Sequence, residues 1–355
     1  MKEKVGLVEL TTYHEECLHS QALFLKDAGY DVHLFIHPKL VNQIADYKAL
    51  FTEIITIEAT SKTFFLKRVL RFLKLHKIIR QNKFLFLIFN TASSKKEVIG
   101  LTFLLKNKVK CVGVIHNLKK VNSSLSQKLI NRYIKKYFVI NDYLLKSTEI
   151  DDKTLSFESF YPIFFPNYKT ADLIKPQNEL WITIPGGLDF NRRDYITIAK
   201  GISKNTNIKI HILGKIDRQN EDTIAFLQYL ELNNIDAKFH FFDEFIPNNL
   251  FHSYLKKSDY ILAPVLIKNE SYTKYKITGA YNLAFAYKTP LICPKPLEVI
   301  PDLKNHSFFY EDADSLSRLI DRLSNENESK KVFYQGSKWS FKNQQNRYIK
   351  FLKSK

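Results

Sequence analysis

The chain has 355 residues, of which 45% are hydrophobic and 25% charged, and it carries a net charge of +18. This length predicts two domains, and the composition is that of a soluble globular protein. The three cysteines, Cys17, Cys111 and Cys293, have no CxxC spacing, which argues against a disulfide framework or a zinc knuckle and fits a reducing cytosol.

The first residues read as a strand. The sequence MKEKVGLVELTT contains two acids, Glu3 and Glu9, and only a short apolar run, so we expect no signal peptide. The longest apolar run, Phe84 to Phe89, is far below the roughly 20 residues that cross a bilayer. We therefore expect a cytoplasmic protein.

An α/β rhythm runs through the first half. Val5 to Leu10 reads as a buried strand, a helix follows a polar loop and ends before Gly29, and Asp31 to Ile36 is a second strand. This βαβ unit predicts a parallel sheet, and it lacks the GxGxxG fingerprint of dinucleotide binding. Further strands are expected at Ile54 to Glu58, Phe84 to Phe89, Lys110 to Ile115 and Tyr137 to Ile140, with helices between them.

The positive charge is concentrated in the same half. The stretch from Ser61 to Ile140 holds 19 Lys or Arg and a single acid, Glu97, so it accounts for the whole excess. Such a field predicts an anionic partner, which could be membrane headgroups, a phosphorylated substrate or nucleic acid. Nucleic acid is the weakest of the three, because no recognised DNA or RNA motif accompanies the charge.

A basic amphipathic helix is expected at residues 63–82, within that stretch. It mixes large apolar side chains with cations and contains no acid, as in helices that lie on a membrane surface. The residues expected to face the membrane are Lys67, Arg68, Arg71 and Lys74. The alternative is a crossover helix that packs its apolar side on the sheet and leaves its lysines in water.

A change of texture follows the first half. Prolines punctuate Phe160 to Pro176 without a helical pattern, which indicates an interdomain linker. A second alternating series then begins, and an aromatic terminal helix is expected within Lys330 to Lys355. The expected strands are Leu180 to Ile184, Ile208 to Leu213, Lys238 to Phe242, Tyr260 to Ala263, Leu291 to Cys293 and Ser307 to Phe309, with helices that include Asn220 to Leu232 and Asn248 to Lys257.

Several loops after strands of the second half suit an anion. Ligands of doubly wound sheets bind outside the carboxyl ends of the strands. The loops found there are Pro185-Gly186-Gly187 with Arg193, then Gly214-Lys215, then Asp243-Glu244, and then Lys276 to Gly279. Glycines let backbone N–H groups face a phosphate, and the last loop opens a helix whose dipole favours an anion. A tight turn followed by an exposed basic helix start is the alternative for the first loop.

The order of these motifs resembles the GT-B glycosyltransferases, and within them the bacterial enzymes of the group 1 or family 4 type that use sugar nucleotides. The motifs IPGG…RR, LGK, FDEFIPNNLFHSYLKKSDYILAPV and KITGAYNLAFAYKTPLI carry the resemblance, which is most specific from Trp181 to Pro294. It implies two Rossmann-like α/β domains that face a cleft. Residues 1–165 would bind the acceptor, residues 166–330 would bind the nucleotide sugar, and residues 331–355 would form a terminal helix that crosses back to the first domain.

The resemblance also implies roles for single residues. Gly186 and Gly187 match the loop that faces the diphosphate, and Arg193 matches its basic contact. The other donor-binding expectations are Lys215 in the next basic loop, Glu244, Phe245 and Ile246 beside the nucleotide base, and Lys276, Thr278 and Gly279 at the turn that closes on the phosphates. His116 matches a histidine near the donor sugar.

One departure from the family pattern concerns stereochemistry. Many retaining members carry a Glu-x7-Glu pair, whose positions are occupied here by Tyr275 and Leu283. Retention and inversion therefore both stay open. An inverting enzyme needs a general base, for which His14, Glu15 and Glu16 in the first loop are the candidates, with a surface polar residue as the alternative for His14. The loops would stabilise the leaving diphosphate without a metal, and no cofactor is expected.

The leading hypothesis is a glycosyltransferase peripheral to the inner face of the cell membrane. It would transfer a sugar from a nucleotide donor to a glycan or polyprenyl-linked acceptor in the synthesis of bacterial surface polysaccharide. One alternative is a sugar-nucleotide 2-epimerase of the same fold, which we expect to be acid-rich around its cleft. The other is a degenerate, non-catalytic member that acts as a partner subunit.

Overall fold

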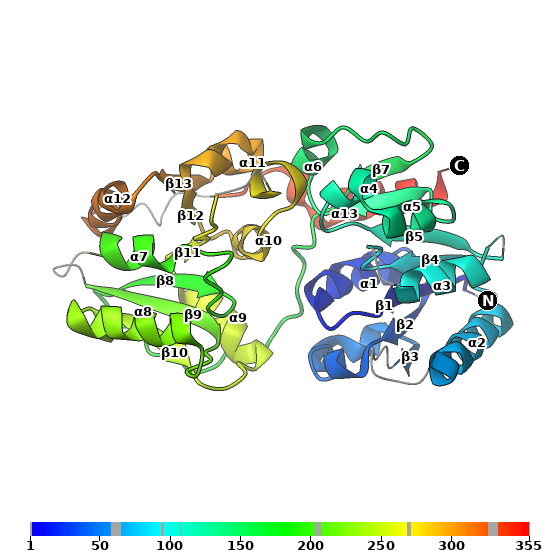
Figure 1. Cartoon of the computed structure of the whole chain (residues 1–355), viewed down its shortest axis with the longest axis horizontal. Coiled ribbons are helices and arrows are strands. Elements are labelled where there is room, and N and C mark those ends of the chain that lie inside the picture. The colour runs from blue at the N-terminus through cyan, green and yellow to red at the C-terminus, as the bar shows by residue number, and fades with distance from the viewer. Residues whose placement is uncertain are drawn as a thin grey trace. The chain divides into compact units, whose positions relative to one another are not determined.

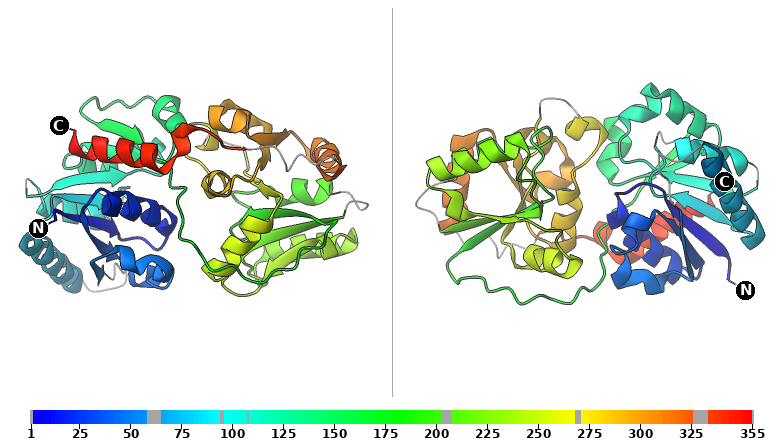
Figure 2. Two further views of the ribbon diagram at one scale, coloured as in Figure 1. Left: turned by 180° about the vertical axis from the view of Figure 1, so that it is seen from behind. Right: turned by 60° about the horizontal axis from the view of Figure 1, so that its bottom comes forward.

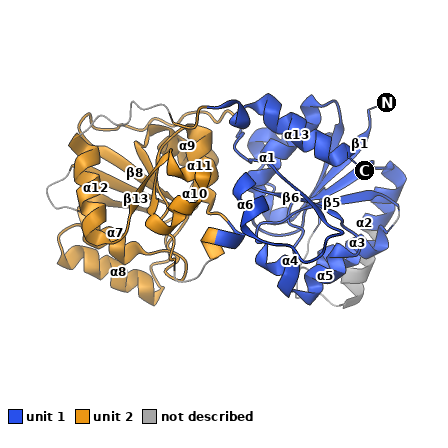
Figure 3. Ribbon diagram, turned by 90° about the horizontal axis from the view of Figure 1, so that it is seen from above, with its two compact units in different colours: residues 1–166, 274–276, 336–355 blue, residues 167–273, 277–335 orange. Residues whose placement is uncertain are grey.

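The computed structural model describes residues 2–57, 65–93, 96–106, 108–202, 207–267, 271–325 and 333–354, without the side chains of residues 65–71 and 74. The chain forms two compact units, which Figure 3 shows in different colours. Unit 1 comprises residues 1–166, 274–276 and 336–355, and unit 2 comprises residues 167–273 and 277–335.

Unit 1 is built on a seven-stranded sheet in the order β3-β2-β1-β4-β5-β6-β7, and every described pairing in it is parallel. The strands are β1 (Lys4–Glu9), β2 (Asp31–Ile36), β3 (Glu53–Thr56), β4 (Phe86–Phe89), β5 (Lys110–Val114), β6 (Lys136–Val139) and β7 (Ser156–Ser159). Its central strands are apolar and nearly inaccessible, with Val5, Leu7 and Ile88 all 0% exposed. This burial on both faces is what a parallel sheet covered by helices requires.

The helices of unit 1 connect its strands, except the C-terminal α13, which follows unit 2 in the chain. They are α1 (Leu18–Asp27), α2 (Phe65–Asn82), α3 (Lys96–Leu104), α4 (Lys119–Ser123), α5 (Leu125–Asn131), α6 (Asp142–Ser147) and α13 (Phe341–Lys353) (Figure 1). The C-terminal helix α13 packs on α1, where the Tyr348 hydroxyl donates to the Gln21 side chain at 2.9 Å. Its Tyr348 ring also stacks on Phe138 of β6, with centroids 4.2 Å apart. The last residues of the chain therefore belong to the same compact unit as the first.

Unit 2 repeats the architecture with a six-stranded parallel sheet in the order β10-β9-β8-β11-β12-β13. The strands are β8 (Leu180–Pro185), β9 (Ile208–Lys215), β10 (Phe239–Phe242), β11 (Tyr260–Leu262), β12 (Leu291–Pro294) and β13 (Ser307–Tyr310). The helices are α7 (Tyr195–Gly201), α8 (Glu221–Leu232), α9 (Asn248–Lys257), α10 (Gly279–Tyr287), α11 (Pro301–Lys304) and α12 (Ala313–Asn325). Helices flank both faces of each sheet (Figure 2).

Each sheet has one point where the strand order reverses direction. It lies between β1 and β4 in unit 1 and between β8 and β11 in unit 2. In sheets of this kind, ligands bind outside the carboxyl ends of the two strands at such a point. These two edges are where ligands are expected.

The prediction of an α/β fold with two Rossmann-like domains is confirmed. The expected strands are present within one to three residues at each end, and no helix or strand lies between Ser159 and Leu180, as the proline-punctuated texture indicated. One strand was missed, β7, whose sequence SFES is short and half polar because it forms the sheet edge. Within the described ranges, no helix combines the length and hydrophobicity needed to cross a bilayer.

The basic helix is present as α2, Phe65–Asn82. The side chains of Lys67, Arg68, Arg71 and Lys74 lie outside what the structure describes. Of the described part, Leu75 and Ile79 are buried and Leu73 is 48% exposed. The C-terminal half of α2 therefore packs an apolar side inward, as a crossover helix does, and also leaves one large apolar side chain in solvent.

Candidate functional site

The candidate site in unit 1 lies where its strand order reverses. Three segments meet there at the carboxyl ends of neighbouring strands: the loop after β1, the turn after β4 and the turn after β5. They bring together Glu9, His14, Asn90 and His116, which are up to 107 positions apart in sequence. This edge of the sheet thus carries carboxylates and imidazoles, which are the groups of proton-transfer chemistry.

Glu9 is the buried anchor of this cluster. Its side chain is 0% exposed and accepts three hydrogen bonds of 2.7 Å, from the Thr11 backbone N–H, the Asn90 side-chain amide and the Thr91 hydroxyl. Burial raises the pKa of Glu9, and these hydrogen bonds oppose the rise because they favour the carboxylate. The last residue of β1 is thereby fixed to the end of β4.

Asn90 connects that anchor to both histidines. Its side-chain amide also donates to the His14 carbonyl at 2.7 Å, while its own side-chain oxygen accepts from Gln21 at 2.6 Å. Its backbone carbonyl lies 2.7 Å from Nε2 of His116. Since a carbonyl can only accept, Nε2 of His116 must carry the proton. Asn90 therefore fixes the position of one histidine and the tautomer of the other.

The two histidine rings stack face to face. The His14 and His116 ring centroids are 3.8 Å apart and the ring planes differ by 4°. Burial, followed by the charge of His14, lowers the pKa of His116 to about 3, so this ring is neutral at physiological pH. The backbone of His14 is left-handed, with φ of 70°, a conformation that costs free energy outside glycine and is found at functional sites.

His14 is held by a carboxylate of its own loop. Its Nδ1 lies 3.2 Å from Oε1 of Glu16. Burial alone would lower the pKa of His14, but the hydrogen bond and the charge of Glu16 outweigh it, and the net shift is upward. Because Nδ1 donates to Glu16, the neutral ring carries its lone pair on Nε2, as in a histidine oriented for general-base catalysis.

The pKa values of the adjacent Glu15 and Glu16 carboxyl groups shift in opposite directions. Burial, and then the charge of Glu16, raise the pKa of Glu15 to about 7. The pKa of Glu16 is lowered although burial raises it, because the hydrogen bond and the charge of His14 hold its carboxylate ionised. The Tyr47 hydroxyl donates to the Glu15 carbonyl at 3.3 Å. Two adjacent glutamates are thus placed in environments that separate their protonation states, a pattern typical of acid and base pairs.

The candidate site in unit 2 is formed by the glycine-bearing loop after β8 and the last residues of β9, which touch; the structure places Gly214 and Lys215 inside β9, and not in a loop after it. Gly186 has φ of 92°, in the region that favours glycine. A Cβ at Gly214 would lie 2.1 Å from the backbone nitrogen of Gly187, so only glycine lets the end of β9 and the loop after β8 approach this closely. Glycine is therefore required here by the close packing of the backbone itself.

Arg193 supports the loop after β8. Its Nη1 donates to the carbonyls of Gly186 at 3.1 Å and Gly187 at 3.4 Å and lies 3.1 Å from the Tyr195 hydroxyl. Its backbone forms a bridge with Val265, which follows β11 across the reversal point. Arg193 therefore ties the β8 loop to the neighbouring strand, and its half-buried guanidinium turns the glycine loop into a positively charged one.

The rim of this edge carries exposed groups. Lys215 Nζ pairs with Glu244 at 3.2 Å, and both side chains are more than half exposed. Phe245 is 65% exposed, whereas Ile246 is buried. An exposed aromatic ring beside the glycine loops offers a face on which a nucleotide base can stack, and the Lys215–Glu244 pair contributes little to stability in so much solvent.

The start of α10 is the last of the predicted donor elements. Thr278 occupies the N-cap position without a side-chain cap, and a Cβ at Gly279 would meet nothing within 4 Å. Lys276 falls in a different unit. The segment 274–276 packs in unit 1, where the Leu118 N–H donates to the Tyr275 carbonyl and the Ser147 hydroxyl donates to the Lys274 carbonyl.

The structure thus gathers the predicted residues into two groups. His14, Glu15 and His116 form one cluster with Glu16 in unit 1, and Gly186, Gly187 and Arg193 form another in unit 2. Sequence reasoning missed Glu9 and Asn90. An acid that ends an otherwise apolar strand was the available signal for Glu9, whereas nothing in the sequence marked Asn90.

Comparison with known proteins places the fold. No protein-family model and no curated protein matches the sequence. Among solved structures, a glycosyltransferase from Rickettsia africae is similar at a TM-score of 0.66 and 14% identity, over 99% of this chain and 94% of that one. Anabaena HepE in complex with UDP and glucose is similar at a TM-score of 0.66 and 12% identity, over 99% of this chain and 97% of that one. The UDP-GlcNAc 2-epimerase from Methanocaldococcus jannaschii is similar at a TM-score of 0.64 and 11% identity, over 98% of this chain and 99% of that one. The chain therefore has the GT-B fold, with two Rossmann-like domains, that glycosyltransferases and UDP-GlcNAc 2-epimerases share.

Proposed function

We propose that the protein is a glycosyltransferase that moves a sugar from a nucleoside-diphosphate donor to a hydroxyl of a glycan or polyprenyl-linked acceptor. The observation that carries the proposal is the His14–Glu16 pair at the reversal point of unit 1, a histidine whose side chain is 30% exposed and whose Nδ1 is held by a carboxylate. The fold supports it, because HepE of the same fold was crystallised with UDP and glucose.

The donor would bind at the carboxyl edge of unit 2. The backbone N–H of Gly187, with the charge of Arg193, would stabilise the diphosphate, whereas the Gly186 N–H already donates to the Leu213 carbonyl at 2.8 Å. The uncapped first turn of α10 at Thr278 and Gly279 would add further N–H groups. Lys215 and Phe245 at the rim would border the nucleotide. Lys276 stays outside this set, because its segment packs with unit 1.

The acceptor hydroxyl would be activated in unit 1. As its oxygen forms a bond to the anomeric carbon, its proton passes to Nε2 of His14, and the bond between that carbon and the diphosphate oxygen breaks. The nucleoside diphosphate leaves with the bonding electron pair. Glu16 stabilises the imidazolium that forms, and His116, whose pKa is lowered by burial, packs on its face without competing for the proton. A single displacement of this kind inverts the anomeric configuration.

The test uses the purified full chain and a panel of sugar nucleotides. We expect one donor to raise the melting temperature in proportion to its occupancy, and the same donor to be consumed when an acceptor is added. His14→Gln should lose turnover and keep donor binding, whereas His76→Gln, at a half-buried position of α2 outside both candidate sites, should keep both. A chain that binds none of the nucleotides would contradict the proposal.

We also propose that unit 1 meets an anionic membrane surface at the inner face of the cell membrane, where lipid-linked acceptors reside. Large exposed apolar side chains lie on three helices that pack in sequence, α2, α3 and α5: Leu73 at 48%, Phe103 at 59% and Leu129 at 40% exposure. The same stretch carries the entire charge excess. Binding to anionic vesicles should therefore weaken as salt is added, and binding that is indifferent to salt would count against this surface.

A second candidate function is favoured by one observation. Three carboxylates, Glu9, Glu15 and Glu16, lie together with two histidines, which is the acid-rich environment expected of a sugar-nucleotide 2-epimerase. That reaction exchanges the proton at C2 of the sugar and needs no acceptor. Incorporation of deuterium at C2 from heavy water, in the donor alone, would favour the epimerase over the transferase.

A further inference from the structure

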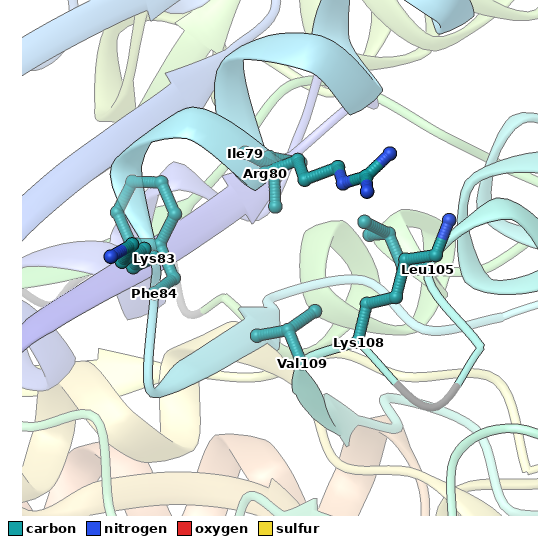
Figure 4. Close-up of a pocket in the computed structure, with 7 residues that line it drawn as sticks. All are labelled: Ile79, Arg80, Lys83, Phe84, Leu105, Lys108 and Val109. Atoms are coloured by element: carbon teal, nitrogen blue, oxygen red, sulfur yellow. The ribbon is translucent and has the colours of Figure 1, made fainter.

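A small pocket opens at the opposite edge of the unit 1 sheet from the histidine cluster. It has a volume of about 190 Å³ and is lined by Ile79, Arg80, Lys83, Phe84, Leu105, Lys108 and Val109 (Figure 4). Phe84 precedes β4 and Val109 precedes β5, whereas Asn90 and His116 follow the same two strands. From Phe84 to Asn90 the extended chain covers roughly 20 Å. The pocket is therefore separate from the candidate catalytic cluster.

The pocket has an apolar floor and cationic walls. Ile79, Phe84 and Leu105 are 2%, 6% and 1% exposed, so they form a fixed surface. Arg80 and Lys108 extend from two different elements toward the same side of the opening, and Lys83 lies on the other side (Figure 4). No acidic side chain is among the seven lining residues. A ligand that fits must therefore pair an anionic group with an apolar one.

The helices that end here do not neutralise these cations. α2 ends at Asn82 and α3 at Leu104, and each carboxyl-terminal helix end contributes about −0.5 charge. Three cations leave about +2 after both ends are counted. Glu97 lies eight residues before Leu105, in the first turn of α3, so it is about 12 Å away along the axis. Within the described ranges, no carboxylate forms an ion pair with Arg80, Lys83 or Lys108.

His76 lies close enough to these cations for their charge to affect its pKa. Its Nε2 lies 3.4 Å from Lys108 Nζ, and its pKa is lowered, first by burial and then by the charges of Lys108 and Arg80. The neutral ring can accept a hydrogen bond from the Lys108 ammonium and so hold that cation at the mouth of the pocket.

From these features we infer that the pocket binds the phosphate group of an anionic lipid, with the phosphate between Arg80 and Lys108 and the first carbons of the ester against the apolar floor. Its volume is below the 300 Å³ or more typical of whole-ligand sites, which suits a headgroup rather than a nucleotide. The position supports a lipid source, because α2 and α3 also carry the exposed Leu73 and Phe103. The site goes beyond the proposed transfer reaction, since it requires neither donor nor acceptor.

The test compares two double variants of the full chain, each of which loses one cation from α2 and one from the segment that follows α3. The pocket variant, Arg80→Gln with Lys108→Gln, removes two cations that line the pocket. The control, Lys77→Gln with Lys106→Gln, removes two exposed cations that do not line it. Binding is measured on phosphatidylcholine vesicles with about 20% phosphatidic acid, and thermal unfolding checks that both variants fold.

We expect the pocket variant to bind these vesicles at least about tenfold more weakly than the charge-matched control. If vesicle binding is weakened equally in both variants, the pocket is not a specific lipid site, and the binding comes from diffuse electrostatic attraction to the membrane. A soluble short-chain phosphatidic acid should bind the wild type and raise its melting temperature, while inorganic phosphate at the same concentration should do neither. Equal binding of inorganic phosphate would overturn the lipid assignment in favour of a free-phosphate site. Sugar-nucleotide binding should be unchanged in both variants, so failure here is distinguishable from failure of the proposed function.

Discussion

The substitution Glu15→Gln tests the electrostatics of the histidine cluster without reference to any substrate. Glutamine resembles the protonated acid in shape and cannot ionise. The pKa of Glu15 is raised from 4.5 to about 7, first by burial and then by the charge of Glu16. A group whose pKa is raised on folding adds stability below its unfolded pKa and loses it as pH rises through the folded value. The wild type should therefore lose stability relative to the variant between about pH 4.5 and 7.

The size of the effect follows from the shift. One pKa unit corresponds to about 1.4 kcal/mol, so the full shift is worth at most roughly 3 kcal/mol. Partial solvent exposure and the coupling to Glu16 reduce this, and we expect about 1–3 kcal/mol between pH 5 and pH 8. A domain stability of 5–15 kcal/mol makes such a change measurable.

Urea unfolding of both proteins across this pH range measures the difference directly. At pH 5 the two should be nearly equal, and at pH 8 Glu15→Gln should be the more stable. Glu16→Gln is the matched control, because the pKa of Glu16 is lowered and its loss should destabilise the protein above that pKa. A difference between wild type and Glu15→Gln that does not change with pH would refute the assigned environment of Glu15.

Two further predictions concern the loops and the base. Gly214→Ala forces a Cβ to 2.1 Å from the Gly187 nitrogen, so nucleotide affinity should fall at least about tenfold by calorimetry, whereas Gly279→Ala, in open space, should leave thermal stability intact. His14→Gln should lower kcat about 100-fold or more with little change in donor KM. In Glu16→Gln the acidic limb of the profile of kcat/KM against pH should move to lower pH, because His14 loses the carboxylate that raises its pKa. Unchanged nucleotide affinity in Gly214→Ala, or an unmoved acidic limb in Glu16→Gln, would contradict the respective site.

The elements of this fold were predictable because their patterns are local. Each buried strand shows as an apolar run, and Gly29 ends the first helix with φ of 89°, as its position indicated. The edge strand β7 escaped because an edge position does not demand apolar residues on both faces. The glycine pair after β8 stood out because it follows a strand directly, and the prediction that it binds an anion stays a prediction.

The architecture of the histidine cluster was not predictable from the same patterns. Glu9 and Asn90 are 81 residues apart, and they meet only because β4 rather than β3 pairs with β1. Strand order is a tertiary property that no local spacing encodes. The tautomer of His116 and the pKa of Glu15 depend in turn on those contacts, so sequence reasoning could name His14, Glu15 and His116 without assigning their protonation.

The parallel sheet also changes what the net charge means. Lys4, Lys110 and Lys136 begin strands of unit 1, so these cations sit at the amino edge of the sheet, with Lys83 just before β4. The groups of the histidine cluster follow the same strands at the opposite edge. A basic stretch in sequence is thus compatible with an acid-rich site in space, and the charge excess cannot decide between transferase and epimerase. Only the requirement for an acceptor separates the two reactions, because the epimerase completes its turnover on the donor alone.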